Sequence, residues 1–335
     1  MIDNIKILDC TLRDGAHINQ GVFGKNNILH ILRNLAQAKI DLIEVGFLQN
    51  TLYDENSTIF NEIRNVDEVL MQTQKLQSKF GIMLRIDRCD FKKLQESSFI
   101  DFVRIAFYKE HLKDLSNYVM RLQDLNYDVY LNPIAITKYS LDEIGMILEF
   151  ILPLKPKGIS IVDTFGALRM ANFVELIQLF DKMISNEIEI GIHLHENLSS
   201  ALSLALQGIS LLPHRNILID ASICGMGRIP GNLPTELIIN HINFADTYDI
   251  KPLYALNEII QEYQKFNKWG YSAIYAHSAI LNIDRSYPEY FDTQGFSHLQ
   301  NIALQNKIKQ YGYGSKFDKN EADMIIRNFC KLNTI

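Results

Sequence analysis

The sequence predicts an α/β protein in which eight strands alternate with helices. Short apolar runs, typical of strands buried in a parallel sheet, recur from the start to about residue 245. Stretches with apolar residues three or four positions apart separate most of these runs, as in amphipathic helices. This alternation over about 240 residues matches a (β/α)8 barrel, which usually has about 250 residues. An open doubly wound sheet is the competing architecture, but no GxGxxG motif follows the first run.

The predicted elements follow one another regularly along the chain. Strands are expected at Ile5–Cys10, Leu42–Phe47, Phe80–Ile86, Phe102–Phe107, Val129–Ile136, Gly158–Asp163, Ile188–His195 and Ile217–Cys224. Helices are expected at Ile28–Ala38, Asp114–Leu125, Leu141–Leu152, Phe173–Ile184 and Ser199–Leu211. Ser140 stands three residues before Glu143, and this spacing predicts a capping box at the start of the helix at 141–152.

The pattern changes after about residue 250. Helical periodicity continues at Tyr254–Phe266, Ile302–Lys309 and Asn320–Lys331. Between them, Trp269–Tyr271 and Tyr287–Tyr290 form an aromatic stretch that we expect to be rich in turns. The chain is therefore expected to divide into a barrel of residues 1–248 and a C-terminal helical extension of residues 249–335.

Composition narrows the class of protein. Apolar residues make up 47% of the chain and charged residues 21%, which is ordinary for a globular protein. The net charge of −6 argues against nucleic-acid binding, and no apolar stretch is long enough to span a bilayer. The N-terminus lacks the pattern of a signal peptide, and the four cysteines form no CxxC pair. We expect a cytoplasmic protein with reduced thiols.

The most informative short motif is His193-Leu194-His195 at the end of a predicted strand. Residues two apart on a strand point to the same face, so both imidazoles are expected to lie side by side. Such a pair suits a divalent metal, and Asp14 at the end of the first strand could add an anionic oxygen. A polar strand end without any ligand is the alternative interpretation.

Three motifs occur in the order typical of a known family: TLRDG at 11–15, HLH at 193–195 and GMGRIPGN at 225–232. Together they resemble the TIM-barrel metallolyases, which include 4-hydroxy-2-oxovalerate aldolase, 3-hydroxy-3-methylglutaryl-CoA lyase and the isopropylmalate and citramalate synthases. The resemblance covers roughly residues 5–245. It implies a closed barrel, with the active site at the C-terminal ends of the strands.

The resemblance also implies a metal centre. Asp14, His193 and His195 would be its ligands, and Asn232 matches a position that supplies a further oxygen in some relatives. A Gly-Asn turn also favours Asn for backbone reasons, so this last assignment has an alternative. Mn²⁺ or Mg²⁺ would suit such an open site, and Co²⁺ or Zn²⁺ would also fit.

Two residues near Asp14 are expected to carry the catalysis. The fork of donors on Arg13 suits a substrate keto oxygen or an enolate, although a structural pair with a carboxylate is the alternative. His17 matches the proton-transfer histidine of the 4-hydroxy-2-oxo acid aldolases, although it would otherwise be a surface histidine. Histidine suits this task because its pKa lies near neutrality.

Further polar residues are expected at the strand ends. Glu44 lies within an apolar strand, where an unpaired charge would be costly, so it is expected to pair with Arg13 or another cation of the site. Together with Glu44, the candidates for substrate contact are Arg85, Asn132 and Thr164.

The sequence thus predicts a divalent-metal-dependent aldolase that cleaves or forms a 4-hydroxy-2-oxo acid through a pyruvate enolate. The main alternative is a carboligase that joins acetyl-CoA to a 2-oxo acid, and a Schiff-base aldolase using Lys138, a metallohydrolase and a catalytically silent barrel are others. The acyl-CoA lyases carry a catalytic cysteine in the loop at 225–232, and this chain has none there. The expected partners are a small 2-oxo acid, further copies of the chain and an aldehyde-processing enzyme.

Overall fold

The computed structural model describes residues 4–243 and 247–332 and contains a parallel β-barrel. Its eight strands are β1 (Ile5–Asp9), β2 (Leu42–Leu48), β4 (Lys79–Arg85), β5 (Phe102–Phe107), β6 (Asp128–Pro133), β7 (Gly158–Val162), β8 (Glu189–His193) and β9 (Ile217–Ala221). The barrel closes because β1 pairs with both β2 and β9. A short strand, β3 (Ile59–Phe60), pairs with the C-terminal end of β2. The predicted (β/α)8 barrel is confirmed.

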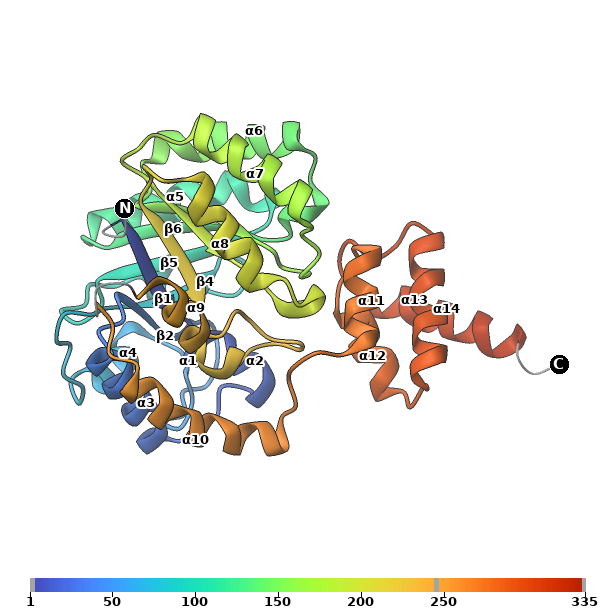
Figure 1. The fold of residues 1–335 in the computed structure, drawn as a ribbon, viewed down its shortest axis with the longest axis horizontal. Coiled ribbons are helices and arrows are strands. Elements are labelled where there is room, and N and C mark those ends of the chain that lie inside the picture. The colour runs from blue at the N-terminus through green and yellow to red at the C-terminus, as the bar shows by residue number, and fades with distance from the viewer. Residues whose placement is uncertain (1–3, 244–246, 333–335) are drawn as a thin grey trace.

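Helices surround the barrel (Figure 1). They are α3 (Lys25–Gln37), α4 (Ile63–Leu70), α5 (Leu112–Asp124), α6 (Leu141–Ile151), α7 (Met170–Met183), α8 (Ala201–Leu211), α9 (Thr235–Ile242) and α10 (Lys251–Phe266). The connection from β4 to β5 is the exception, since it contains only a single 3₁₀ turn at Phe91–Lys93. The predicted capping box is confirmed: Ser140 Oγ accepts a hydrogen bond from Glu143 N, and the Glu143 carboxylate accepts one from Ser140 N.

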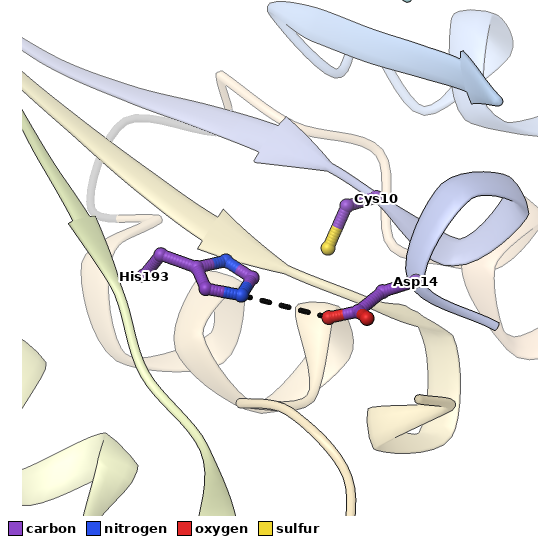
Figure 2. Close-up of side chains that lie close together, drawn as sticks. All are labelled: Cys10, Asp14 and His193. Carbon is purple, nitrogen blue, oxygen red and sulfur yellow. Dashed lines mark ion pairs between the residues drawn. The ribbon is translucent and has the colours of Figure 1, made fainter. Parts of the chain in front are cut away.

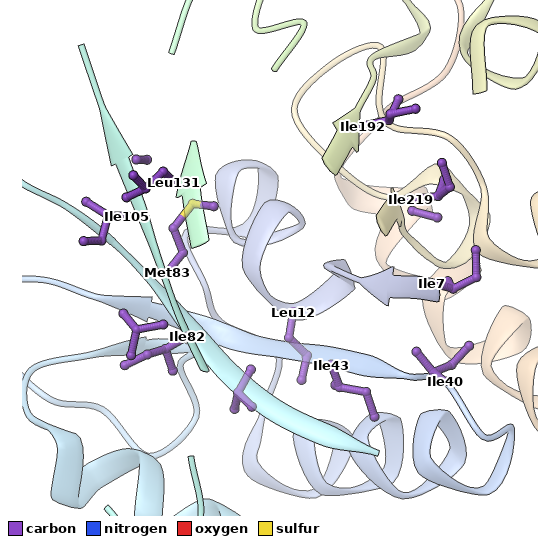
Figure 3. Close-up of a cluster of buried hydrophobic side chains, with 14 of the residues drawn as sticks. Ile7, Leu12, Ile40, Ile43, Ile82, Met83, Ile105, Leu131, Ile192 and Ile219 are labelled. Carbon is purple, nitrogen blue, oxygen red and sulfur yellow. The ribbon is translucent and has the colours of Figure 1, made fainter. Parts of the chain in front are cut away.

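The barrel has an outer and an inner apolar core because side chains alternate along each strand. The outer core packs the strands against the helices (Figure 3) and includes Ile7, Ile43, Ile82, Ile105, Leu131, Ile192 and Ile219. Inside the barrel, Leu8, Phe102 and Tyr130 pack together. Gly81 and Gly158 make room for the two rings, because a Cβ there would lie 2.3 Å from Phe102 and 2.6 Å from Tyr130.

The C-terminal part has two portions. Helix α10 packs on the barrel, and Leu256, Ile260 and Trp269 belong to the barrel's core. Helices α11 (Ala273–Leu281), α12 (Ser286–Thr293), α13 (His298–Gln310) and α14 (Lys319–Leu332) form a separate bundle beside the barrel (Figure 1). This bundle has its own core of Ile283, Tyr287, Phe291, Leu304, Ile308, Ala322 and Ile325. The division at residue 248 stays a prediction, since α10 continues the core of the barrel.

One expectation for the extension is wrong. Tyr287–Tyr290 was expected to form turns but lies within α12. Pro288 is the third residue of this helix, where a backbone N–H has no partner inside the helix, so proline is tolerated there. Within the described ranges, no helix combines the length and apolarity needed to cross a membrane.

Candidate metal centre and its pocket

Three side chains meet at the C-terminal end of the barrel. His193 ends β8, and His195 follows two residues later, so both rings point into the mouth of the barrel. Asp14 ends the short helix α1 (Thr11–Asp14), which directly follows β1. The sequence therefore places all three at strand ends, and closure of the barrel brings them together.

Both imidazoles present a ring nitrogen to the same carboxylate oxygen. Asp14 Oδ2 lies 3.5 Å from His193 Nε2, an approach drawn in Figure 2, and 3.7 Å from His195 Nε2. The other ring nitrogens are held from behind, because His193 Nδ1 lies 2.9 Å from Asp220 Oδ2 and His195 Nδ1 lies 2.8 Å from the main-chain oxygen of Asp163. If both Nδ1 atoms donate to these oxygens, each Nε2 carries a lone pair directed at Asp14.

The donor set fits a divalent cation. Asp14 Oδ2 and His195 Nε2 are buried and have no hydrogen-bond partner among the described residues. Burying such atoms without a partner is costly, and a cation between them would remove that cost. Cys10 Sγ is also close to Asp14 and His193 (Figure 2), but its thiol donates to the main-chain oxygen of Ala221 at 3.2 Å. Burial raises the pKa of this thiol, so His195 is the better third donor.

Asn232 approaches the same region from the loop after β9. Its backbone pairs with that of His195, and its Nδ2 donates to the main-chain oxygen of Met226 at 3.2 Å. The amide oxygen is buried and has no partner within the part of the chain that the structure describes. This oxygen is therefore available as a further donor.

Arg13 lies between two carboxylates. Its Nε donates to Glu44 Oε2 at 2.6 Å, and its Nη1 lies 3.3 Å from Asp14 Oδ1. Burial opposes ionisation of Asp14, but Arg13 and the two imidazoles outweigh it and hold the pKa of this carboxyl well below its ordinary value. Asp14 is therefore ionised at neutral pH. Glu44 lies behind Arg13 and does not line the pocket among the described residues.

A layer of buried charges lies beneath the three donors. Arg104 is fully buried, with Nη1 3.4 Å from Glu44 Oε2 and Nη2 2.5 Å from Asp220 Oδ2. Asp220 in turn holds His193, so Arg13, Glu44, Arg104, Asp220 and His193 form one chain of contacts. Burial opposes the charge on Asp220, but Arg104 and His193 lower the pKa of this carboxyl below its ordinary value. The ring of His193 is thus fixed by an ionised partner.

His17 lies at the edge of the site, in helix α2 (Ala16–Asn19). Its Nε2 is 3.7 Å from Asp14 Oδ1, and its ring meets the ring of Phe47 edge-on with centroids 5.3 Å apart. Desolvation lowers the pKa of His17 more than the neighbouring carboxylate of Asp14 raises it, and Arg228 and Arg285 lower it further. The imidazole is therefore neutral at neutral pH, although 36% of the side chain is exposed and accessible to a ligand.

The donors open into a cavity of about 190 Å³. Arg85, Asn132 and Thr164 line it, as do Arg13 and His17. Arg85 is held by a bidentate contact with Asp87, and Thr164 Oγ1 accepts a hydrogen bond from Ala135 N at 2.7 Å. Asn132 Oδ1 is buried without a partner among the described residues. Lys138, the Schiff-base candidate, is not part of the described lining, and its ammonium group contacts the main-chain oxygen of Asn282.

Comparison with known proteins assigns the chain to a family. The HMGL-like family model matches residues 4–264. The chain belongs to the HMGL-like family. This group consists of lyases, aldolases and synthases, so the chain is related to enzymes.

Individual relatives of this HMGL-like chain are distant. It is 22% identical over 299 residues to 4-hydroxy-2-oxovalerate aldolase of Bacillus cereus, covering 84% of this chain and 85% of the relative. It is 24% identical to 2-isopropylmalate synthase of Acetivibrio thermocellus, but spans only 53% of that protein. A solved N-terminal domain of a candidate aldolase from Bacteroides vulgatus has a TM-score of 0.73 and 23% identity, covering 89% of this chain and 99% of that one. The last similarity supports the fold alone.

Several charged residues at or beneath the site of this HMGL-like chain were not among those expected from the sequence, including Arg104, Asp220, Arg228 and Arg285. Arg104 and Asp220 are charged residues inside apolar strands, and the argument applied to Glu44 would have identified them. Arg228 lies in the glycine-rich loop, and Arg285 immediately precedes α12. No local pattern marks Arg285, because only the packing of the extension brings it to the pocket.

Proposed function

We propose that this protein is a divalent-metal-dependent aldolase that cleaves or forms a 4-hydroxy-2-oxo acid through a pyruvate enolate. The observation that carries the proposal is the meeting of Asp14, His193 and His195 directly beside Arg13 and His17. The aldolases among its relatives, at 22–24% identity, are consistent with it.

The metal would be held by Asp14, His193 and His195, with Asn232 as a further oxygen donor. Mixed carboxylate, amide and imidazole donors favour Mn²⁺ or Mg²⁺, with Co²⁺ and Zn²⁺ as alternatives. A bound cation would supply Lewis acidity that favours the enolate of a 2-oxo acid.

The remaining chemistry falls to side chains of this chain. Arg13 donates to the 2-oxo oxygen, where negative charge grows as the C3–C4 bond breaks. Glu44 holds Nε of Arg13 and Asp14 lies beside Nη1, so Nη2 is the nitrogen that would donate to the 2-oxo oxygen. His17, which is neutral, accepts the proton of the 4-hydroxyl as the aldehyde forms. The proton on His17 then returns to solvent, and a solvent proton added at C3 converts the enolate to pyruvate. Arg85, Asn132 and Thr164 orient the substrate.

The test is exchange of the methyl protons of pyruvate in D₂O, followed by NMR with Mn²⁺ present. We expect metal-dependent exchange, together with aldehyde release from a 4-hydroxy-2-oxo acid. The alternative supported by the synthase relatives is a carboligase that uses acetyl-CoA. Release of CoA thiol from acetyl-CoA plus a 2-oxo acid, without any exchange of pyruvate protons, would establish that alternative instead. A cytoplasmic location, association between copies and an aldehyde-processing partner stay predictions.

A further inference from the structure

The helical extension places a buried arginine at the pocket of the barrel. Arg285 is only 5% exposed and lines the same cavity as Asp14 and His195. Its Nε has no hydrogen-bond partner among the described residues, and its Nη1 makes one long contact, 3.4 Å, with the main-chain oxygen of Arg228. Burial and Arg228 lower the pKa of Arg285 to about 10, so the guanidinium still carries its charge at neutral pH.

The acidic groups nearest in sequence to Arg285 are already engaged. Both carboxylate oxygens of Asp284 accept main-chain N–H groups, one from Ser286 and one from Phe317. Glu289 pairs with Arg228 at 2.6 Å. Within the described ranges, the N–H groups of Arg285 are therefore not paired with any side-chain carboxylate.

The cavity is lined by several arginines, although the chain has a net charge of −6. Its described lining holds five arginines and two aspartates, but Arg13, Arg85 and Arg228 are paired with carboxylates, so two arginines, Arg88 and Arg285, have no carboxylate partner among the described residues. The five arginines are Arg13, Arg85, Arg88, Arg228 and Arg285. A single carboxylate, such as that of pyruvate, accounts for only part of this charge.

A buried guanidinium without a partner is costly, and an anionic ligand offsets that cost. An aldehyde with an apolar chain would offer Arg285 nothing to bind. We propose that Arg285, supported by Arg228, binds a second anionic group, a carboxylate or a phosphate, carried by the part of the substrate distal to the 2-oxo acid. This inference rests on the proposed aldolase function, whose substrate class it narrows to 2-oxo acids with a distal anion.

The experiment compares three ligands of similar length by isothermal titration with the full chain and Mn²⁺. They are 2-oxopentanoate, 2-oxoglutarate and 2-oxo-4-phosphonobutanoate, in which the distal end is a methyl, a carboxylate or a phosphonate. We expect one or both of the charged ligands to bind about ten- to a hundredfold more tightly than 2-oxopentanoate, as charge-assisted hydrogen bonds provide. The stronger of the two identifies the distal group.

Variants assign the preference to Arg285. Arg285→Gln should lose most of the preference for the charged ligands over 2-oxopentanoate, while its affinity for pyruvate stays unchanged. Arg285→Lys should retain part of that preference because the charge remains. Arg327→Gln, at an exposed arginine of α14, is the control and should behave as the wild type. A circular dichroism melt of each variant checks that the fold is retained.

Two results would overturn the proposal. One is equal binding of all three ligands by the wild type. The other is a parallel loss of pyruvate affinity in Arg285→Gln, which would mean that Arg285 holds the carboxylate of the 2-oxo acid itself. Exchange of pyruvate protons in the wild type is a separate readout. If it fails while the preference for a distal anion depends on Arg285, the anion site stands and the aldolase function falls.

Discussion

Asp14 Oδ2 and His195 Nε2 show how a single buried atom indicates chemistry. Both atoms are buried at the C-terminal end of the barrel and lack hydrogen-bond partners within the described ranges. Native proteins satisfy most buried polar atoms, so an unpaired cluster calls for a ligand. Because the two imidazoles are fixed through their other nitrogens, they cannot rotate away to find other partners.

For these individual ligands, we predict that the variants His193→Ala and Asp14→Asn lose bound metal. His193→Ala removes one of the three donors and Asp14→Asn removes the negative charge of another, so each variant should hold a cation poorly. Elemental analysis after equilibration with Mn²⁺ measures the effect. His30→Ala, at an exposed histidine of α3, serves as the control. Equal metal content in the wild type and all three variants would show that His193 and Asp14 are not ligands.

His17 permits a prediction that separates proton transfer from enolate formation. His17→Ala should lower kcat for cleavage of a 4-hydroxy-2-oxo acid by about 10²–10⁴-fold, the usual contribution of a general base. Exchange of pyruvate protons should fall much less, because Arg13 still stabilises the enolate. Both rates are measured by NMR, with His214→Ala at an exposed histidine as the control. A similar fall in both rates would show that His17 acts on the enolate instead.

Among the elements, β2, β5 and β9 each carry one buried charged residue between apolar ones. Arg104 and Asp220 occupy inward positions of these strands and, with Glu44 on β2, form the layer beneath the donors. Each charge in the layer contacts an opposite one, which is the condition under which buried ions are tolerated. The layer thus links Glu44 on β2, which holds Arg13, to Asp220 on β9, which holds His193.

We predict that Arg104→Met destabilises the protein by about 3–5 kcal/mol, because it leaves Glu44 and Asp220 as buried charges without their shared partner. Urea unfolding followed by circular dichroism gives the free energy of unfolding. The control is Lys79→Met on the neighbouring strand β4. Lys79 pairs with Asp128, but its side chain is 48% exposed, so the loss should not exceed about 1 kcal/mol. Comparable losses in the two variants would contradict the role given to the layer.

At the scale of the whole molecule, the barrel and the extension have separate apolar cores, and the segment between α10 and α11 joins the two parts. The single tryptophan of the sequence, Trp269, belongs to the barrel's core and donates through Nε1 to the main-chain oxygen of Cys224 at 2.9 Å. Its fluorescence therefore reports on the barrel, whereas circular dichroism reports on the helices of both parts.

From this arrangement we predict that the extension unfolds separately from the barrel. Phe291→Ala should destabilise the extension by about 3–5 kcal/mol, since the side chain is fully buried in its core. The midpoint of the fluorescence transition in urea should stay at its wild-type value, while the circular dichroism transition splits in two. Phe180→Ala, in the barrel's core, should instead shift the fluorescence transition. A shift of both signals together in Phe291→Ala would mean that the chain unfolds as one unit.

The alternation of strands and helices, the capping box at Ser140 and the grouping of Asp14, His193 and His195 could be predicted from the sequence alone. These features depend on local periodicity and on the rule that strand ends of a barrel converge. Glu44 was expected to neighbour a cation for a similarly local reason, because a charge in an apolar strand needs a partner.

Tertiary structure alone decided the rest. Helix α12 has no clear local signal, and its aromatic residues become helical by packing into the core of the extension. The position of Arg285 depends on where α11 and α12 dock, and its spacing from Asp14 in sequence carries no information about that docking. Local sequence sets which side chains share a face, whereas contacts between distant segments set which faces meet. In this protein, the docking of the extension on the barrel places Arg285 in the same pocket as Asp14, His193 and His195.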